Sequence, residues 1–314
     1  YGSSFWERSS GHVRIYQNNG GTWTQIGEDI DGESSSNLSG GSVSLSHNGL
    51  TDVVAIGAYA NDGNGDRSGH VRIYKNEGDT WTQIFNDIDG EAAGDESGSS
   101  LALSDDGSVV AIGSRFNNGN GEYSGHVRIY QRDFDIYRQA WSWKQIGNDI
   151  DGESAGDFSG NSVALSSDGS VVAIGASYND GNGEYSGHVR IYQNDGGTWT
   201  QILHDIDGET ANDFSGDSVA LSADGSVVAI GAERNDGNGS NSGHVRIYQE
   251  TSGISQNLSE NTTEVTTFTA TNDGGDTISW SISGDDSGLF EINSASGVLT
   301  FKRAPDYETP GSTA

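Results

Sequence analysis

The chain has 314 residues, and its 46 acidic residues against 15 basic ones give a formal net charge of −31. A surface of this charge repels nucleic acid and anionic lipid and attracts divalent cations, so we expect no nucleic-acid partner. The sequence has no Cys, which excludes disulfides, thiol catalysis and Cys-ligated zinc. No apolar run approaches the roughly 18 residues of a membrane helix, so this segment is not expected to insert into a membrane.

The composition favours an all-β fold. Gly accounts for 47 residues, and Val, Ile, Thr, Tyr and Trp cluster between stretches of Gly, Asn, Asp and Ser. This arrangement predicts short strands joined by turns. Only 32% of the residues are hydrophobic, so we expect a thin core distributed over several small sheets. The acidity fits solubility in a salty medium as well as calcium binding, and the composition does not separate the two.

An internal repeat dominates the chain. Four equivalent tryptophans, Trp23, Trp81, Trp143 and Trp199, are spaced by 58, 62 and 56 residues. Two extra residues in the turn SHNGLTD and six between Tyr130 and Trp143 account for the longer spacings, so the underlying period is 56 residues. The motif SGHVRIY follows the same period and occurs at Ser10–Tyr16, Ser68–Tyr74, Ser124–Tyr130, Ser186–Tyr192 and Ser242–Tyr248.

Each unit contains four predicted strands, with the sequences WTQI, SVALS, VVAIGA and HVRIY. SVALS and VVAIGA are separated by a short polar turn and predict a hairpin. HVRIY alternates as a half-buried strand does, whereas VVAIGA is apolar on both faces. Four strands per unit predict a β-propeller blade, and a stacked β-solenoid is the alternative. The predicted units are about 1–16 (partial), 17–74, 75–130, 131–192 and 193–249.

Residues 1–249 resemble the FG-GAP repeats of integrin-α-like propellers. The Gly-Ala pairs at 57–58, 175–176 and 231–232 fit the family directly, whereas Phe158-Ser159-Gly160 and Phe214-Ser215-Gly216 replace its contiguous Phe-Gly pair. The resemblance implies a propeller used for binding or adhesion and seldom for chemistry. The calcium loop of integrin-type repeats lies between the two hairpin strands. That turn is too short here, so this site is not carried over.

The first copy of the motif lacks the strands that precede it in the other units. Tyr1 aligns with Tyr59, because both stand eleven residues before the histidine of the motif. We therefore expect these residues to be part of a longer chain whose full ring has at least five blades.

A Gly-rich acidic loop precedes each later copy of the motif. Oxygen ligands at alternate positions let a tight loop surround Ca²⁺, which takes six to eight oxygens. The same spacing is also typical of Asn-Gly and Asp-Gly turns with positive φ. We predict structural calcium at Asp62, Asn64 and Asp66, at Asn118, Asn120 and Glu122, at Asp180, Asn182 and Glu184, and at Asp236 and Asn238.

A second acidic loop follows each predicted WTQI strand. In one unit it contains Asp149, Asp151, Glu153 and Asp157, and the first three of these recur as Asp29/Asp31/Glu33, Asp87/Asp89/Glu91 and Asp205/Asp207/Glu209. Paired carboxylates serve as general acid and base in glycosidases. Catalysis needs one asymmetric site, however, and these residues are repeated. The repetition therefore favours a structural or cation-binding role over an enzyme.

The histidine and arginine of the motif share one face of the predicted strand. Two interpretations follow: a ring of imidazoles that binds zinc or copper if the strand lines the axis, or pairing with the acidic loops between blades. The scarcity of basic residues favours the second. The residues are His12, His70, His126, His188 and His244, with Arg14, Arg72, Arg128, Arg190 and Arg246.

The insertion in the third unit is the one segment of the array that does not repeat. Exposed aromatic and Arg side chains are typical of binding hot spots. We predict a contact with a protein or glycan ligand, and the alternative is a long hairpin whose aromatics pack on one another. The predicted contact residues are Arg132, Phe134, Tyr137, Arg138 and Trp141.

Residues 250–258 form a polar linker, and residues 259–314 resemble a partial cadherin-like β-sandwich. The resemblance rests on Ser259-Glu260-Asn261, Leu289–Ile292 and Asp306-Tyr307-Glu308. It implies calcium ligands at Glu260, Asp306 and Glu308.

Taken as a whole, the sequence predicts an extracellular or cell-surface adhesion scaffold that is stabilised by calcium and is not an enzyme. Its expected partners are a protein or glycan ligand, or further copies of the chain. The alternatives are a structural subunit of an extracellular filament or sheath, and a propeller hydrolase or lyase that acts on polysaccharide.

Overall fold

The computed structural model describes residues 9–47, 49, 51–249, 264–267, 290–294 and 298–302. The chain divides into two compact units, residues 1–250 and 251–314. All regular elements of the described residues are strands, which confirms the predicted all-β class. The described residues contain no helix long and apolar enough to span a bilayer.

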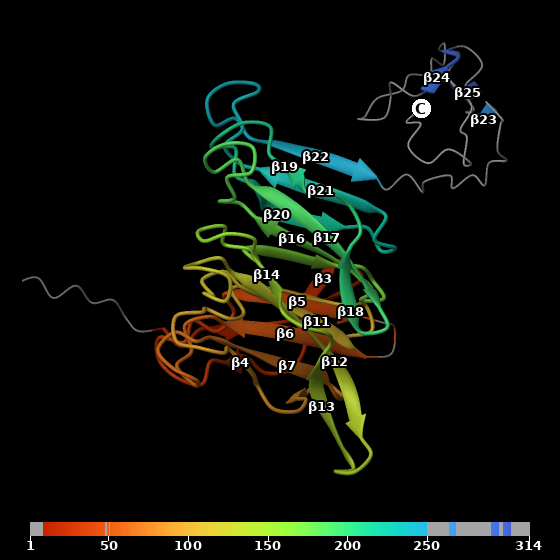
Figure 1. Ribbon diagram of the computed structural model, residues 1–314. Helices are drawn as coiled ribbons and strands as arrows, with labels where there is room; N and C mark the ends of the chain where they lie inside the picture. The colour runs from red at the N-terminus through yellow and green to blue at the C-terminus, as the bar shows by residue number, and fades with distance from the viewer. Residues whose placement is uncertain are drawn as a thin grey trace, which may run out of the picture. The chain divides into compact units, whose positions relative to one another are not determined.

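The first unit contains three complete antiparallel sheets (Figure 1). In each sheet four strands pair in chain order, and a fifth, very short strand pairs with the start of the third. The first sheet has β5 (Ser42–His47), β6 (Asp52–Ala58), β7 (His70–Asn76), β8 (Trp81–Gln83) and β9 (Ile88–Asp89). The second has β10 (Ser100–Leu103), β11 (Val109–Ser114), β12 (His126–Asp135), β13 (Ala140–Gln145) and β14 (Ile150–Asp151). The third has β15 (Ser162–Leu165), β16 (Val171–Ala176), β17 (His188–Asp195), β18 (Thr198–Gln201) and β19 (Ile206–Asp207).

Partial sheets lie before and after these three in the sequence. The strands β1 (His12–Val13) and β4 (Ile30–Asp31) pair with each other, as do β2 (Tyr16–Asn19) and β3 (Thr22–Gln25). The strands β1 and β2 together correspond to the third strand of a complete sheet, β3 to the fourth and β4 to the fifth. The last sheet consists of β20 (Ser215–Leu221), β21 (Val227–Ala232) and β22 (His244–Gln249).

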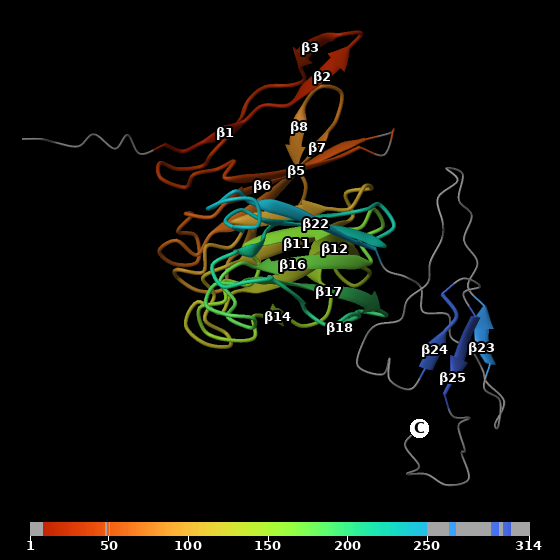
Figure 2. The same ribbon diagram turned by 90° about the horizontal axis from the view of Figure 1, so that it is seen from above.

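The sheets stack face against face as propeller blades do (Figures 1 and 2). Their first strands, β5, β10, β15 and β20, contact one another in succession. The core lies between the sheets, because the VVAIG strands are apolar on both faces. In β11, Val110 and Ile112 pack toward the first sheet, whereas Val109 and Ala111 pack toward the third. The prediction that this strand is buried on both sides is confirmed.

The sheets do not coincide with the predicted sequence units. The strand that contains WTQ pairs with the HVRIY strand before it, as Tyr192 opposite Gln201 shows. A short turn joins these two strands, whereas a long acidic loop leads from WTQ to the next sheet. HVRIY, which we expected to close each unit, is thus the third of four strands.

The second unit has three described strands, β23 (Glu264–Thr267), β24 (Phe290–Ile292) and β25 (Val298–Phe301). They form one antiparallel sheet in the order β23-β25-β24. The described residues include no second sheet that would complete a sandwich. The linker 250–258 and the predicted ligands Glu260, Asp306 and Glu308 lie outside the described residues.

Candidate functional sites

The insertion forms the outer half of a long hairpin between β12 and β13, which projects beyond the other strands (Figure 1). Phe134 lies opposite Trp141 in the ladder, and their ring centroids are 5.3 Å apart. Tyr137, at the tip, is 92% exposed. The aromatics of the hairpin therefore pack on one another at its middle, while the tip presents a free ring to solvent.

Hydrogen bonds fix the conformation of this tip. The Asp135 carboxylate accepts hydrogen bonds from the backbone N–H groups of Tyr137 (2.8 Å) and Arg138 (3.0 Å). At the base, the guanidinium of Arg132 donates to the carbonyl of Asp106 at 3.2 Å. Of the predicted contact residues, Arg132 thus has a structural role, and Tyr137, Arg138 and Trp141 remain available to a ligand.

A groove lies beside the base of the hairpin. Its lining includes the aromatic residues Phe85, Trp141 and Trp143 and the polar residues Asn86 and Ser142. Phe85 and Trp143 meet edge to face, with centroids 5.9 Å apart. Aromatic residues beside polar ones provide both stacking and hydrogen-bonding surfaces.

The Gly-rich loops predicted to bind calcium are held by hydrogen bonds of their own. The carboxylate of Asp62 accepts from the backbone N–H of Arg67 at 2.9 Å, and the Asn118 side chain accepts equivalently from Tyr123 at 2.8 Å. Because an amide oxygen serves as well as a carboxylate, this contact needs no charge. Arg67 and Tyr123 have positive φ, as expected for a tight turn.

The middle residue of each loop ties it to the acidic loop that follows. The amide of Asn182 donates to the carbonyls of Gly208 (2.7 Å) and Glu209 (3.1 Å), and Asn64 and Asn120 make the same pair of bonds. The equivalent Asn238 donates its backbone N–H to Ser242. At the first position of the loop, Asp180 and Asp236 each accept a hydrogen bond from a backbone N–H group five residues later, as Asp62 does. The side chains at the third position, Asp66, Glu122 and Glu184, are exposed.

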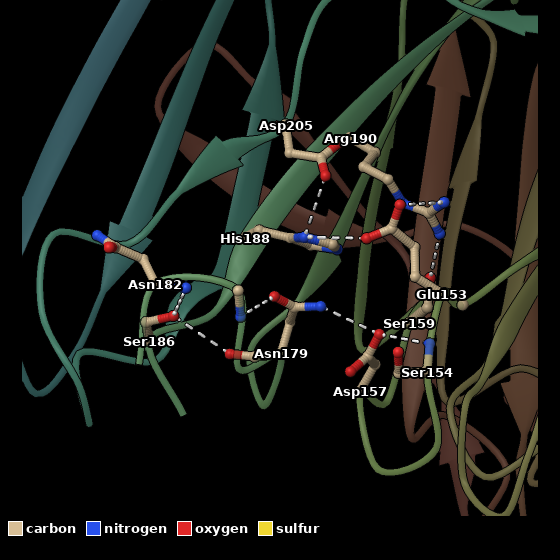
Figure 3. A network of polar contacts seen from close by, with 12 residues as sticks. Glu153, Ser154, Asp157, Ser159, Asn179, Asn182, Ser186, His188, Arg190 and Asp205 are labelled. Carbon is tan, nitrogen blue, oxygen red and sulfur yellow. Dashed lines mark hydrogen bonds and ion pairs between the residues drawn. The ribbon is translucent and has the colours of Figure 1, made fainter. Parts of the chain in front are cut away.

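A different set of residues converges between neighbouring sheets. Glu153 lies in the loop after β14 of the second sheet, His188 begins β17 of the third sheet, and Asp205 precedes β19. The Nδ1 atom of His188 is 3.8 Å from a Glu153 oxygen and 3.9 Å from an Asp205 oxygen (Figure 3). The same arrangement recurs as Glu91–His126–Asp149 and Glu33–His70–Asp87. We call these three sets the Glu–His–Asp clusters.

The arginine of the motif positions each cluster from the side. Arg190 donates to the carbonyl of Asp151 at 2.6 Å, and its Nη1 lies 3.9 Å from the second oxygen of Glu153. Its guanidinium also packs over the ring of Tyr192, with the carbon 5.5 Å from the centroid. This arginine therefore connects two sheets, which is the pairing between blades that the sequence predicted.

Burial sets the protonation of the clusters. Desolvation lowers the pKa of His188 to about 4 and that of His126 to about 4, and it lowers the pKa of His70 as well. It also raises the pKa of Glu91 and Glu153 above the usual range. At neutral pH each imidazole is therefore neutral and faces two carboxylates.

The alternative of a ring of imidazoles is wrong for the described residues. The histidines stand in the third strands of their sheets, and the first strands are the ones that meet across the stack. Each buried histidine instead faces its own pair of carboxylates. Asp157, the fourth residue of the acidic loop, is outside the cluster and accepts hydrogen bonds from Ser154 and Asn179 (Figure 3).

Sequence reasoning named the acidic loops but did not assign Glu153 and Asp205 to one site. The signal was the recurrence of the sequence DIDGE before and after each motif histidine. It was not sufficient, because each cluster takes its glutamate from one sheet and its aspartate from the next.

Comparison with known proteins supports the fold. Residues 199–248 match the family model described as the FG-GAP repeat. A solved structure from Bacteroides uniformis, of a candidate 6-phosphogluconolactonase, is similar with a TM-score of 0.50 at 12% identity, over 79% of this chain. The chain spans 64% of that protein's length.

Two structures of Sqt1 from Chaetomium thermophilum, one bound to the N-terminus of the ribosomal protein L10, have TM-scores of 0.40. The match to the first structure has 17% identity and covers 66% of this chain and 43% of the Sqt1 chain. The match to the second has 16% identity and covers 66% of this chain and 44% of the Sqt1 chain. No curated protein matches the sequence. The chain therefore contains an FG-GAP repeat within a propeller-like arrangement of sheets.

Proposed function

We propose that this chain is an extracellular or cell-surface binding scaffold, in which the stacked sheets hold the β12–β13 hairpin out toward a protein or glycan ligand. The observation that carries the proposal is the exposed tip. Tyr137 is 92% and Trp141 56% exposed, although large apolar side chains are costly to leave in water. Exposed aromatics beside arginine are typical of binding hot spots.

Rigidity supports the same proposal. The tip turn is fixed by Asp135, and Arg132 anchors the hairpin to the sheet, so little conformational entropy is lost on binding. The groove beside Trp141 and Trp143 extends the contact surface, and the polar side chains of Asn86 and Ser142 in its lining would form hydrogen bonds with sugar hydroxyls. A carbohydrate or a hydroxyl-rich peptide fits this chemistry better than an anionic ligand.

The proposal includes calcium as a structural cofactor of the Gly-rich loops and a cadherin-like module over residues 259–314. The alternating oxygens of Asp180, Asn182 and Glu184 and the net charge of −31 support the calcium. Thermal unfolding in calcium and in EDTA tests it. A melting temperature that is equal in the two buffers would exclude structural calcium.

A trimmed hairpin tests the binding role. In this variant Arg132–Trp143 is replaced by the equivalent shorter segment Asn194–Trp199 of the third sheet, whose ends occupy the same register. We expect the wild-type protein to bind a subset of a glycan array or to self-associate in sedimentation, and the trimmed protein to lose that binding at an unchanged melting temperature. Equal binding by both proteins would show that the hairpin is not the contact.

The double variant Tyr137→Ser/Trp141→Ser is the matched control for backbone changes. It keeps the length of the hairpin and removes only the two exposed rings. We expect it to reproduce the loss seen with the trimmed protein. If it binds as the wild type does, the rings do not contribute to the contact.

A further inference from the structure

We propose that the three Glu–His–Asp clusters are binding sites for a divalent transition metal of the zinc class, which cross-links neighbouring sheets. This inference goes beyond the proposed function and does not depend on it. The sites are Glu33–His70–Asp87, Glu91–His126–Asp149 and Glu153–His188–Asp205.

The first argument is the unpartnered imidazole. The side chain of His188 is 1% exposed, and among the described residues its Nε2 atom is buried without a hydrogen-bond partner. Nδ1 points between the two carboxylates at 3.8 and 3.9 Å, which is too long for a hydrogen bond. His70 and His126 are equally buried and have the same geometry, with distances from 3.6 to 3.9 Å. In all three clusters the Nδ1 atom of a buried imidazole therefore faces two carboxylates without a hydrogen bond to either of them.

The second argument is the size of the space between the ligand atoms. A tetrahedral zinc ion about 2.0–2.1 Å from each ligand separates those ligands by roughly 3.4 Å. In the third cluster the nitrogen is 3.8 and 3.9 Å from the two oxygens, and all three ligand atoms lie within 4.8 Å of one another, so small movements of the side chains would bring them to bonding distance of one ion. The carboxylates are 43% and 31% exposed, which leaves them free to adjust and the ion free to enter.

The third argument is charge. Each cluster brings two carboxylates and one arginine together beside the imidazole, so the carboxylates outnumber the nearby cation. Arg190 lies near Oε1 of Glu153, whereas Oε2 of the same carboxylate faces His188. The arginine therefore orients the glutamate without occupying the oxygen that a metal would use.

The ligand types favour transition metals over calcium. Imidazole nitrogen with carboxylate oxygen suits zinc and its neighbours, whereas calcium takes oxygen ligands. Because Glu153 belongs to one sheet and His188 and Asp205 to the next, a bound ion joins two sheets. It should stabilise the folded state by mass action.

The chain also contains incomplete copies that serve as internal controls. His244 lies 3.8 Å from Glu209, but no aspartate of the described residues completes that site. His12, near the beginning of the described residues, is exposed and belongs to none of the three clusters. We therefore expect three metal ions per chain rather than five.

The test is zinc binding by the full chain after EDTA treatment and dialysis. We expect isothermal titration with ZnSO₄ and elemental analysis to give three equivalents, and the melting temperature to rise by ~5 °C or more at saturating zinc. Cobalt substitution should give visible absorption bands of a four- or five-coordinate ion. No zinc uptake, or uptake of calcium in place of zinc at these residues, would overturn the proposal.

The isosteric variants Glu153→Gln and Asp205→Asn keep the shape of one cluster and remove its charge. Each should bind two equivalents instead of three, with an unchanged circular dichroism spectrum. The exposed histidines provide matched controls: His47→Gln and His204→Gln should each retain three. If the cluster variants also retain three equivalents, the metal is bound elsewhere and the proposal fails. The trimmed hairpin should keep all three, which separates this test from that of the ligand contact.

Discussion

Gly175 of the third sheet lies directly against Gly216 of the last sheet, so close that a Cβ atom on Gly175 would stand 2.0 Å from the carbonyl oxygen of Gly216. The same approach joins Gly113 to Gly160 and Gly57 to Gly98, at 2.2 Å in each case. Gly57, Gly175, Gly160 and Gly216 belong to the Gly-Ala and Phe-x-Gly segments that suggested the FG-GAP family, and Gly98 and Gly113 are their equivalents in the other repeats. Their repetition has a packing cause: two backbones meet where no side chain fits.

The variant Gly175→Ala should destabilise the protein by about 1–3 kcal/mol, because the new methyl group meets backbone that cannot move aside cheaply. The measurement is the midpoint of urea denaturation. Gly231→Ala is the control at the equivalent position of the last sheet, where the close neighbour is the flexible side chain of Ser218. Equal losses in the two variants would contradict the backbone contact.

The variant Arg190→Met should cost about 2–4 kcal/mol of unfolding free energy in metal-free buffer. Its guanidinium is buried and bonds the Asp151 carbonyl of the neighbouring sheet, so the substitution leaves that acceptor and Glu153 without their cation. Arg14→Met is the matched control, because Arg14 pairs with Asp29 at the surface. Solvent screens that exposed pair, so Arg14→Met should change the unfolding free energy far less than Arg190→Met does. A loss as large as that of Arg190→Met would argue against the role of burial.

Substitutions at the tip and at the base of the β12–β13 hairpin should have different effects on stability. We expect Tyr137→Ser to change the unfolding free energy by less than about 0.5 kcal/mol, because its side chain lies in solvent. Trp143→Ala should cost about 2–3 kcal/mol, since Trp143 packs against Phe85 and the core between the first and second sheets. Chemical denaturation of both variants checks this, and a large loss in Tyr137→Ser would mean that the tip packs on the protein.

Asp224 should make stability depend on pH in the acid range. Hydrogen bonds from Ser222 and Ser226 hold its pKa at about 2, below the usual 3.8. Its contribution is therefore complete above about pH 4 and is lost as the pH falls through 2. The difference in melting temperature between wild type and Asp224→Ala should shrink over this window. A difference that stays constant from pH 5 to 2 would contradict the shift.

The interior of each sheet could be read from the sequence almost strand by strand. VVAIGA predicted burial on both faces, and in β16 Val172 and Ile174 are buried on one face and Val171 and Ala173 on the other. The placement of the WTQ strand was harder. Its pairing partner is the HVRIY strand that precedes it in the chain. A repeating sequence does not show at which strand one sheet ends and the next begins, so the WTQ strand was assigned to the wrong end of the unit.

The candidate site residues also fall into those that the sequence predicted and those that it missed. The exposed aromatics of the insertion were predicted, because a segment that breaks a repeat is visible in the sequence. The assignment of Arg132 to a ligand contact did not anticipate its bond to the Asp106 carbonyl. The Glu–His–Asp clusters were missed, since the glutamate lies 35 or 37 residues before the histidine and the aspartate 17 or 23 residues after it, and the glutamate belongs to a different sheet.

The sequence by itself determined the strand content, the 56-residue period and the propeller-like architecture, because these follow from local alternation and turn residues that recur along the chain. Only the tertiary structure decided which loops face each other. Stacking one sheet on the next brings Glu153 to His188 and Gly175 to Gly216, and neither encounter is encoded within a single repeat. The repeat period determines which strand sequences recur in each sheet, whereas the packing of one sheet on the next brings together the residues of the candidate metal sites.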